Sequence, residues 1–347
     1  MKRLILTLSN KAVSFKKMED KCMKYKFARR GEVTVNEFNE IVKNLFDSVE
    51  RIETGDFKQE DVIEYVKGII GTSKSCKGMP EGLFWGYAEP DEMPSDARVD
   101  LFYMPTYYNV AFMMKAFMVM PEKLLSIDNF LETISRGLTG CTGRAFLGHG
   151  YEGVEVFCRV MKLFLQARVD EFVNVFPEIS SAFTNQINSA FDHIRETVEK
   201  QTIESQNDTE IVVFRELFER IVSKDFNYVF VYGTLMKGQS NHDVFMKEAQ
   251  FVSNAALLNY ELYNLGSYPG VKYKDDTRVK GELYRVSNDI LEDLDCLEGK
   301  DSLFLYEDVV VELNERVRAH AHVYSYIPEV NDALVIAYDL QPWNVDN

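Results

Sequence analysis

The sequence predicts an α+β protein of two domains, a helical one over residues 1–223 and a strand-rich one over residues 224–347. Three observations predict this organisation. The chain has 347 residues, which is more than one hydrophobic core usually serves. Apolar residues recur at helical spacing before residue 224 and mainly at strand-like spacing after it. The change of pattern occurs near residues 223–226 without a long, flexible linker.

The first part predicts an all-helical domain. Residues 107–120, YYNVAFMMKAFMVM, are apolar nearly all round and predict a buried helix. The other predicted helices cover 35–51, 127–138, 151–165, 168–200 and the end of 206–223. The role of this domain is not indicated by any motif. Its glycine-rich stretch 136–153 contains His149 and Glu152, which form either an acid/base pair in a cleft or part of a packed connection between helices.

The second part predicts strands, because its segments are rich in β-branched and aromatic residues. These strands cover residues 227–232, 251–263, 279–286, 306–313 and 317–326. One helix is predicted among them, over residues 288–298. Ser287 is placed to cap its first turn, and Gly299 follows its last residue, where the backbone commonly turns left-handed.

The predicted helix 288–298 ends at Glu298. This carboxylate stands at the negative end of the helix dipole, close in sequence to other acidic residues, and both influences disfavour its ionised form. We therefore expect a raised pKa and proton exchange near neutral pH. The alternative is that Glu292, Asp293, Asp295 and Glu298 are a solvated helix face.

The turn after the first predicted strand, YGTLMKG, begins at Tyr232. Gly233 can adopt a positive φ and lets another group approach the backbone closely. Successive N–H groups in such a turn can converge on a small anion, for which a carboxylate is the natural guest. The alternative is an ordinary turn between a strand and a loop.

Five motifs in order carry a resemblance to a known family. They are FVYGTLMKG (230–238), GSYPGV (266–271), VKGELYRV (279–286), LEDLDCLEG (291–299) and LYEDVVVEL (305–313). Together they resemble the γ-glutamylcyclotransferase-like family, in particular its γ-glutamylamine cyclotransferase branch. The resemblance covers roughly residues 226–330 and implies a small mixed β-barrel with a few helices.

The resemblance also implies a function and a site. It implies a cyclotransferase that releases 5-oxoproline from a γ-glutamyl amine, with Glu298 as the general acid/base and no metal or cofactor. The residues that it assigns to substrate binding are Tyr232, Gly233, Thr234, Leu235 and Tyr306. Asp308 departs from the family pattern, because many relatives carry a basic residue there, so the sequence gives no support for an acidic leaving group. The alternative is a non-catalytic ligand-binding or interaction protein that retains the fold.

Composition excludes several classes of partner. The formal charge of −16 disfavours nucleic acid and anionic membranes. The apolar run from Leu4 to Leu8 is too short for a signal peptide, and the five widely spaced cysteines are typical of free thiols in a cytoplasmic protein. His320 and His322 share a strand face, but with no third ligand evident we expect no metal site there. The expected partner is a small-molecule γ-glutamyl substrate, and the oligomeric state is not indicated.

Overall fold

The computed structural model describes residues 51–52, 54–85, 104–142, 160–185, 226–313 and 317–344. The chain divides into two compact units. One consists of Met1–Val173 with Ile179–Ile221, and the other of Asn174–Glu178 with Val222–Asn347. The predicted domain boundary at 223/224 and the predicted helices 35–51 and 206–223 fall almost entirely outside the described residues, as do His149 and Glu152.

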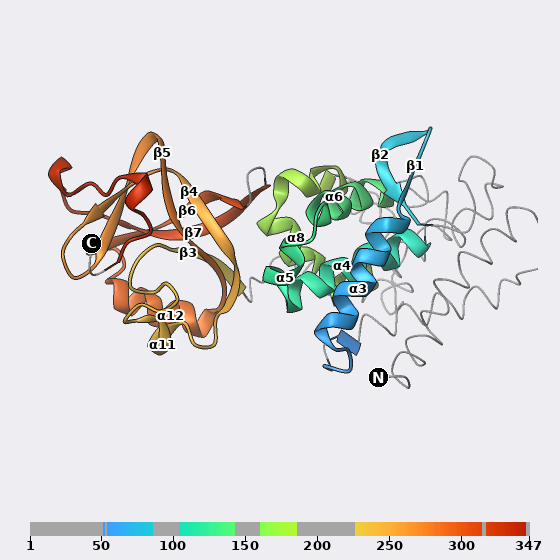
Figure 1. Ribbon diagram of the computed structural model, residues 1–347, viewed down its shortest axis with the longest axis horizontal. Helices are drawn as coiled ribbons and strands as arrows, with labels where there is room; N and C mark the ends of the chain where they lie inside the picture. The colour runs from blue at the N-terminus through green and yellow to red at the C-terminus, as the bar shows by residue number, and fades with distance from the viewer. Residues whose placement is uncertain are drawn as a thin grey trace, which may run out of the picture. The chain divides into compact units, whose positions relative to one another are not determined.

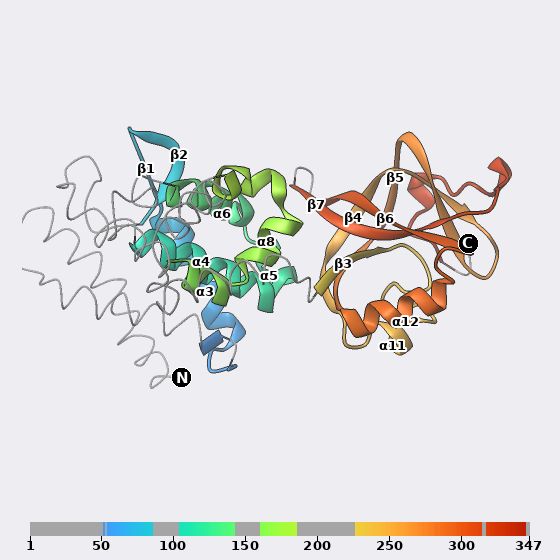
Figure 2. The same cartoon turned by 180° about the vertical axis from the view of Figure 1, so that it is seen from behind.

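The first unit is mainly helical (Figures 1 and 2). Its elements are α3 (Gln59–Thr72), β1 (Lys74–Cys76), β2 (Met79–Phe84), α4 (Met104–Val119), α5 (Pro121–Leu125), α6 (Phe130–Cys141) and α8 (Val169–Val175). Residues 160–166 and 177–185 are also helical. Helix α4 confirms the buried helix predicted over 107–120, because nearly all of its side chains are buried.

The prediction of an all-helical domain is wrong for residues 74–84. Strands β1 and β2 pair antiparallel there as a hairpin, and β2 packs on α6. Gly140 of α6 permits this contact, since a Cβ atom at that position would lie 2.2 Å from the carbonyl oxygen of Leu83. The hairpin was missed because MPEGLF contains both proline and glycine, which argue against a strand.

The second unit is built on a closed five-stranded barrel in the order β3-β5-β4-β6-β7. Its strands are β3 (Phe226–Val231), β4 (Gln250–Asn264), β5 (Pro269–Ser287), β6 (Phe304–Leu313) and β7 (Val317–Tyr326). Short elements complete it, namely α11 (His242–Phe245), η5 (Asp332–Leu334) and η6 (Tyr338–Leu340). Neighbouring strands are antiparallel except β3 and β7, which are parallel and close the barrel through Val229 and His322. The barrel is therefore mixed, as the sequence analysis expected.

Helix α12 (Asn288–Glu298) lies beside α11 on one side of the barrel (Figures 1 and 2). Its bounds match the predicted 288–298. The Ser287 hydroxyl accepts a hydrogen bond from the Ile290 N–H at 3.4 Å, and Gly299 ends the helix at φ 58°. Both predicted end signals are thus confirmed. Leu294 is fully buried against the barrel, and this fixes the direction in which the helix ends.

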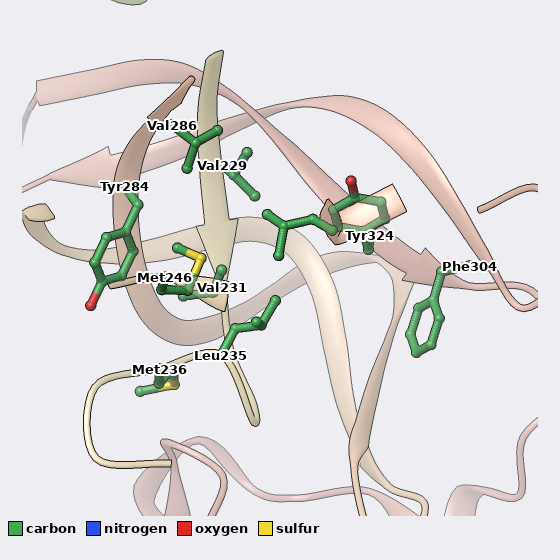
Figure 3. Packing of buried hydrophobic residues seen from close by; sticks show 10 residues of the cluster. Val229, Val231, Leu235, Met236, Met246, Tyr284, Val286, Phe304 and Tyr324 are labelled. Atoms are coloured by element: carbon green, nitrogen blue, oxygen red, sulfur yellow. The ribbon is translucent and has the colours of Figure 1, made fainter. Parts of the chain in front are cut away.

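The core beneath α11 and α12 joins the barrel to the loop that follows β3. It contains Val229 and Val231 of β3, Tyr284 and Val286 of β5, and Leu235 and Met236 of the loop, with Met246, Leu294, Phe304 and Tyr324. In Figure 3 Leu235 extends from the loop towards the strands, and Met236 lies close to the loop ribbon. The loop is consequently held by buried side chains and is part of the folded core.

Two glycine substitutions test the packing of the first unit. Gly140→Ala should lower its free energy of unfolding by about 1–3 kcal/mol, because the added methyl group overlaps the Leu83 backbone. Gly68→Ala should raise it by about 0.5–1 kcal/mol, since Gly68 lies in α3 with nothing within 4 Å of its Cβ position. Urea denaturation followed by Trp85 fluorescence, in a common Trp343→Phe background, measures both. Equal stability of the two variants would contradict the close approach of α6 and β2.

Candidate active site

One pocket of about 320 Å³ lies in the second unit, where the loop after β3 faces the end of α12. Its lining includes Tyr232, Gly233, Thr234, Leu235 and Glu298. The structure therefore brings together the predicted turn and the predicted carboxylate, which are more than sixty positions apart in the sequence. Further lining residues are Phe230, Val231, Ser240, Asn241, Ser267, Tyr268, Pro269, Leu297, Leu303, Phe304 and Tyr324.

Glu298 is half-buried in this pocket, and burial raises the pKa of its carboxyl group to about 7. The predicted direction of the shift is confirmed, but the predicted cause is wrong. The helix end and the neighbouring acidic residues were expected to raise the pKa, whereas desolvation does so. Glu292 and Asp293 of the same helix are exposed. The alternative, that the acidic residues form a solvated helix face, is therefore correct for these two residues but not for Glu298.

Asp295 lies one turn before Glu298 and is tied into the protein by two contacts. Its carboxylate accepts the Tyr324 hydroxyl at 2.6 Å and pairs with the Lys300 ammonium group at 2.8 Å. Burial, together with this hydrogen bond, raises the pKa of Tyr324. The Asp295 carboxylate is thus already bound to Tyr324 and Lys300. Its hydrogen bond holds the Tyr324 ring in the pocket wall.

Gly233 is required by close packing and not by a positive φ. Gly233 is not one of the described glycines that have a positive φ. A Cβ atom at Gly233 would lie 2.4 Å from Cγ of Pro269, so any side chain there would displace one wall of the pocket. Of the two uses of Gly233 that the sequence suggested, close approach is correct and left-handed backbone is wrong.

The loop after Gly233 is held by its own hydrogen bonds. The Met236 N–H donates to the Gly233 carbonyl at 2.9 Å, which is the pattern of a β-turn. The Asn241 N–H donates to the Thr234 carbonyl at 3.0 Å, and the Asn241 side-chain amide donates to the Thr234 hydroxyl at 3.1 Å. His242 Nδ1 lies 2.9 Å from the Leu235 carbonyl oxygen. These contacts use the carbonyl groups of the loop.

Three N–H groups of the same loop are not used by these contacts. Within the described part of the chain, the backbone N–H groups of Gly233, Thr234 and Leu235 donate to no protein acceptor. All three residues line the pocket. Successive amides of this kind can bind a carboxylate or a developing oxyanion.

Tyr232 joins the start of the loop to β7, the strand that neighbours β3 in the barrel. Its hydroxyl donates to the Tyr324 carbonyl at 2.6 Å, and its ring is buried. Burial raises the pKa of Tyr232, and the charge of Glu298 adds to the effect. Tyr232 is therefore neutral and acts here as a hydrogen-bond donor between β3 and β7.

Tyr306 was expected to line the pocket, but the tyrosine of β6 and β7 that lines it is Tyr324. Tyr306 packs against Tyr324 with ring centroids 5.1 Å apart, and its ring also stacks on His322 at 4.5 Å. The role predicted for Tyr306 in substrate binding stays a prediction, and the structure places it behind the pocket wall. Tyr324 was missed because β7 carries histidine and tyrosine side chains at alternate positions. The sequence does not show which of these side chains face the pocket once α12 has packed on the barrel.

The two histidines of β7 do not meet at the pocket. His322 Nδ1 lies 2.9 Å from Oδ1 of the exposed Asp308, and His320 is exposed. Among the described residues, no group of three or more histidine, cysteine, aspartate or glutamate side chains is arranged to hold a metal ion. None of the described helices is both long and apolar enough to cross a membrane.

Comparison with known proteins gives the family of this second unit. Residues 229–344 match the family model described as gamma-glutamyl cyclotransferase, AIG2-like. A candidate γ-glutamylcyclotransferase of Methanocaldococcus jannaschii is 32% identical over 118 residues, which are 33% of this chain and 97% of that protein. The chain belongs to the γ-glutamyl cyclotransferase, AIG2-like family. The resemblance noted from the five motifs is thereby confirmed.

Further similar proteins match between a fifth and about a third of the chain. The family protein YtfP of Escherichia coli (strain K12) is 44% identical over 72 residues, so the match spans 21% of this chain and 62% of YtfP. The γ-L-glutamyl-butirosin B γ-glutamyl cyclotransferase of Niallia circulans is 34% identical over 111 residues, 30% of this chain and 69% of that enzyme. A crystal structure of an AIG2-like protein from Mus musculus covers 35% of this chain and 88% of its own, with 22% identity and a TM-score of 0.29.

The raised pKa of Glu298 predicts a pH-dependent stability. The folded-state pKa of about 7 lies above the ordinary glutamate pKa of 4.5, so the folded state binds the proton more tightly than the unfolded state does. Its contribution to stability is full below pH 4.5 and is lost as the pH rises through 7. Glu298→Gln should therefore be more stable than the wild type by about 1–3 kcal/mol at pH 8.

At pH 4 the same substitution should leave stability nearly unchanged, because the glutamate is then protonated in both states. Urea denaturation at the two pH values measures the difference. Glu292→Gln is the matched control, since this residue of the same helix is exposed and should show no such dependence. A Glu298→Gln variant without extra stability at pH 8 would contradict the burial of an ionisable group in this pocket.

Proposed function

We propose that the second unit is a cyclotransferase that releases 5-oxoproline from a γ-glutamyl amine, with Glu298 as its general acid and base. One observation carries the proposal. A carboxyl group whose pKa burial raises to about 7 lines the same pocket as Gly233, Thr234 and Leu235, whose backbone N–H groups have no protein acceptor among the described residues. Family membership supports a cyclotransferase activity in general.

The proposed reaction is an intramolecular transfer that balances without a further reactant. Ionised Glu298 accepts a proton from the α-ammonium group of the substrate. The free amine attacks the γ-carbonyl carbon, forming the ring C–N bond, and the C–N bond to the leaving amine breaks. Glu298 gives its proton to the departing amine, then takes the second proton from the ring nitrogen and passes it to the released amine, which leaves as an ammonium ion. A pKa near 7 suits both halves of this cycle at neutral pH.

The loop supplies position and charge stabilisation in this proposal. Its free N–H groups at Gly233, Thr234 and Leu235 hold the substrate carboxylate or the oxyanion that forms at the γ-carbonyl. Tyr232 and Tyr324 hold the two sides of the pocket together through their hydrogen bond. By binding the substrate on both sides, the pocket favours the folded conformer of the substrate, in which the amine and the γ-carbonyl lie close enough to react. Tyr306 supports the Tyr324 side of the wall from behind.

The pocket lining also favours a leaving group without negative charge. Glu298 is the one charged side chain among the described lining residues, and Lys237 of the adjacent loop is exposed and not part of the lining. A carboxylate on the leaving amine would meet no cation in this lining and would lie in a site with an acidic group. The proposed substrates are therefore γ-glutamyl derivatives of simple or cationic amines.

Activity of the full-length protein tests the assignment. Release of 5-oxoproline from γ-glutamylethylamide should fall about 10²- to 10⁴-fold in Glu298→Gln, while Glu292→Gln should retain the wild-type rate. In the wild type, kcat/KM should rise with pH through a pKa near 7, because the base must be ionised. Wild-type protein that binds the substrate without turnover would instead support a ligand-binding role, and full activity in Glu298→Gln would refute the proposed base.

Two substrates that differ by one group test the leaving-group preference. γ-Glutamylethylamide carries a methyl group where γ-glutamylglycine carries a carboxylate. We expect kcat/KM to be about 10-fold or more in favour of the ethylamide, equivalent to about 1.4 kcal/mol. The difference should shrink at high salt, since it arises from charge. Equal values for both substrates would show that the missing cation has no consequence.

A further inference from the structure

Glu282 is a buried carboxylate that the proposed reaction does not use. It lies on β5 and is only 9% exposed. Within the described residues its side chain forms no ion pair with lysine or arginine. A buried carboxylate must be compensated by hydrogen bonds, so its partners indicate what it does.

Two hydrogen-bond donors meet at one oxygen atom of the Glu282 side chain. Oε2 accepts the backbone N–H of Lys237 at 2.8 Å and the hydroxyl group of Tyr284 at 3.0 Å. Lys237 follows the pocket-lining turn by two positions. Tyr284 is two residues along β5 on the same face of the strand, and its ring packs near His242 at 5.7 Å. Glu282 therefore contacts the far end of the loop from the strand beneath it.

The backbone of Glu282 also pairs with the strand residue that directly precedes the loop. In the β3–β5 ladder, Glu282 is the partner of Val231, the last residue of β3. The backbone of β5 at this position thus fixes where the loop leaves the barrel, and the Glu282 side chain fixes the loop again six positions later. In Figure 3 the Tyr284 hydroxyl group points downwards, to the side on which the loop with Leu235 and Met236 lies.

We propose that Glu282 is a positioning residue that clamps the segment 232–237, so that the amides of Gly233, Thr234 and Leu235 are held ready for the substrate. The clamp rests on the proposed function for its effect on catalysis, but not for its effect on the loop. Charge-assisted hydrogen bonds to backbone N–H groups are the strong ones, and preorganised donors need no rearrangement when charge develops. The N–H group that Glu282 holds lies next to Met236, whose side chain is buried in the core.

Hydrogen exchange of the free protein tests the clamp without any substrate. In Glu282→Ala the Lys237 amide should lose protection by about 10- to 100-fold, while amides of β6 and β7 keep theirs. Glu282→Gln keeps an acceptor oxygen for the same N–H and should stay within about threefold of the wild type. A uniform loss over the whole barrel, or unchanged protection of Lys237 in Glu282→Ala, would overturn the proposal.

Steady-state kinetics then link the clamp to the pocket. Glu282→Ala should raise KM for γ-glutamylethylamide or lower kcat/KM by about 10- to 100-fold, and Glu282→Gln should restore most of it. The pKa seen in the kcat/KM profile should stay near 7, because Glu298 is untouched. A merely structural residue would reduce the amount of active protein without changing KM or the exchange of a single loop amide.

The chain offers a matched control at Glu261. This carboxylate accepts the Tyr263 hydroxyl at 2.7 Å, again two positions along a strand, but it pairs with Lys274 and does not contact the loop. Glu261→Ala should leave KM and Lys237 exchange at wild-type values. If wild-type protein releases no 5-oxoproline, the proposed function fails, while the exchange experiment still decides whether Glu282 holds the loop.

Discussion

The burial of one side of α12 against the barrel is the contact on which the site depends. Leu294 is fully buried there, so the helix lies flat and its last residue comes to the edge of the pocket. Glu298 is then shielded from water by the same packing, and its affinity for a proton rises for that reason. A helix of identical sequence that ended in solvent would carry an ordinary carboxylate.

The loop after β3 complements this carboxylate through a different kind of constraint. Its carbonyl groups are satisfied by Met236, Asn241 and His242, whereas three of its N–H groups have no acceptor within the described part of the chain. Pro269 presses against Gly233 from one side, and Tyr232 reaches across to β7. The loop therefore presents donors in a fixed arrangement, while the acid/base group comes from a separate element of the fold.

Elements with strong local signals were predictable from sequence. Helix 288–298 and strand 317–326 agree with the structure at both ends, since Ser287, Gly299 and the alternation of β7 are local properties. The meeting of the Gly233 turn with Glu298 was predictable only through the family resemblance that the five motifs carry. The hairpin at 74–84 was not predictable, because its strands are stabilised by packing on α6 and contain residues that disfavour strands.

The sequence did not predict the cause of the Glu298 pKa shift or the position of Tyr324, for a related reason. Both depend on which surfaces α12 covers, and burial by a distant element leaves no trace in nearby residues. The sequence suggested nearby charges as the cause because nearby charges are what it displays. Likewise, the aromatic residues Tyr306, Tyr324 and Tyr326 cannot be told apart until the helix is placed over some of them.

The parallel pairing of β3 with β7 has a consequence for biosynthesis. The first barrel strand to leave the ribosome must wait for the last before the ring can shut, and the hydrogen bond from Tyr232 to the Tyr324 carbonyl spans 92 positions. Contacts between distant parts of a chain form slowly, and unpaired strands are exposed in the meantime. During translation the barrel therefore cannot close, and Tyr324 cannot complete the pocket wall, until β7 has emerged from the exit tunnel.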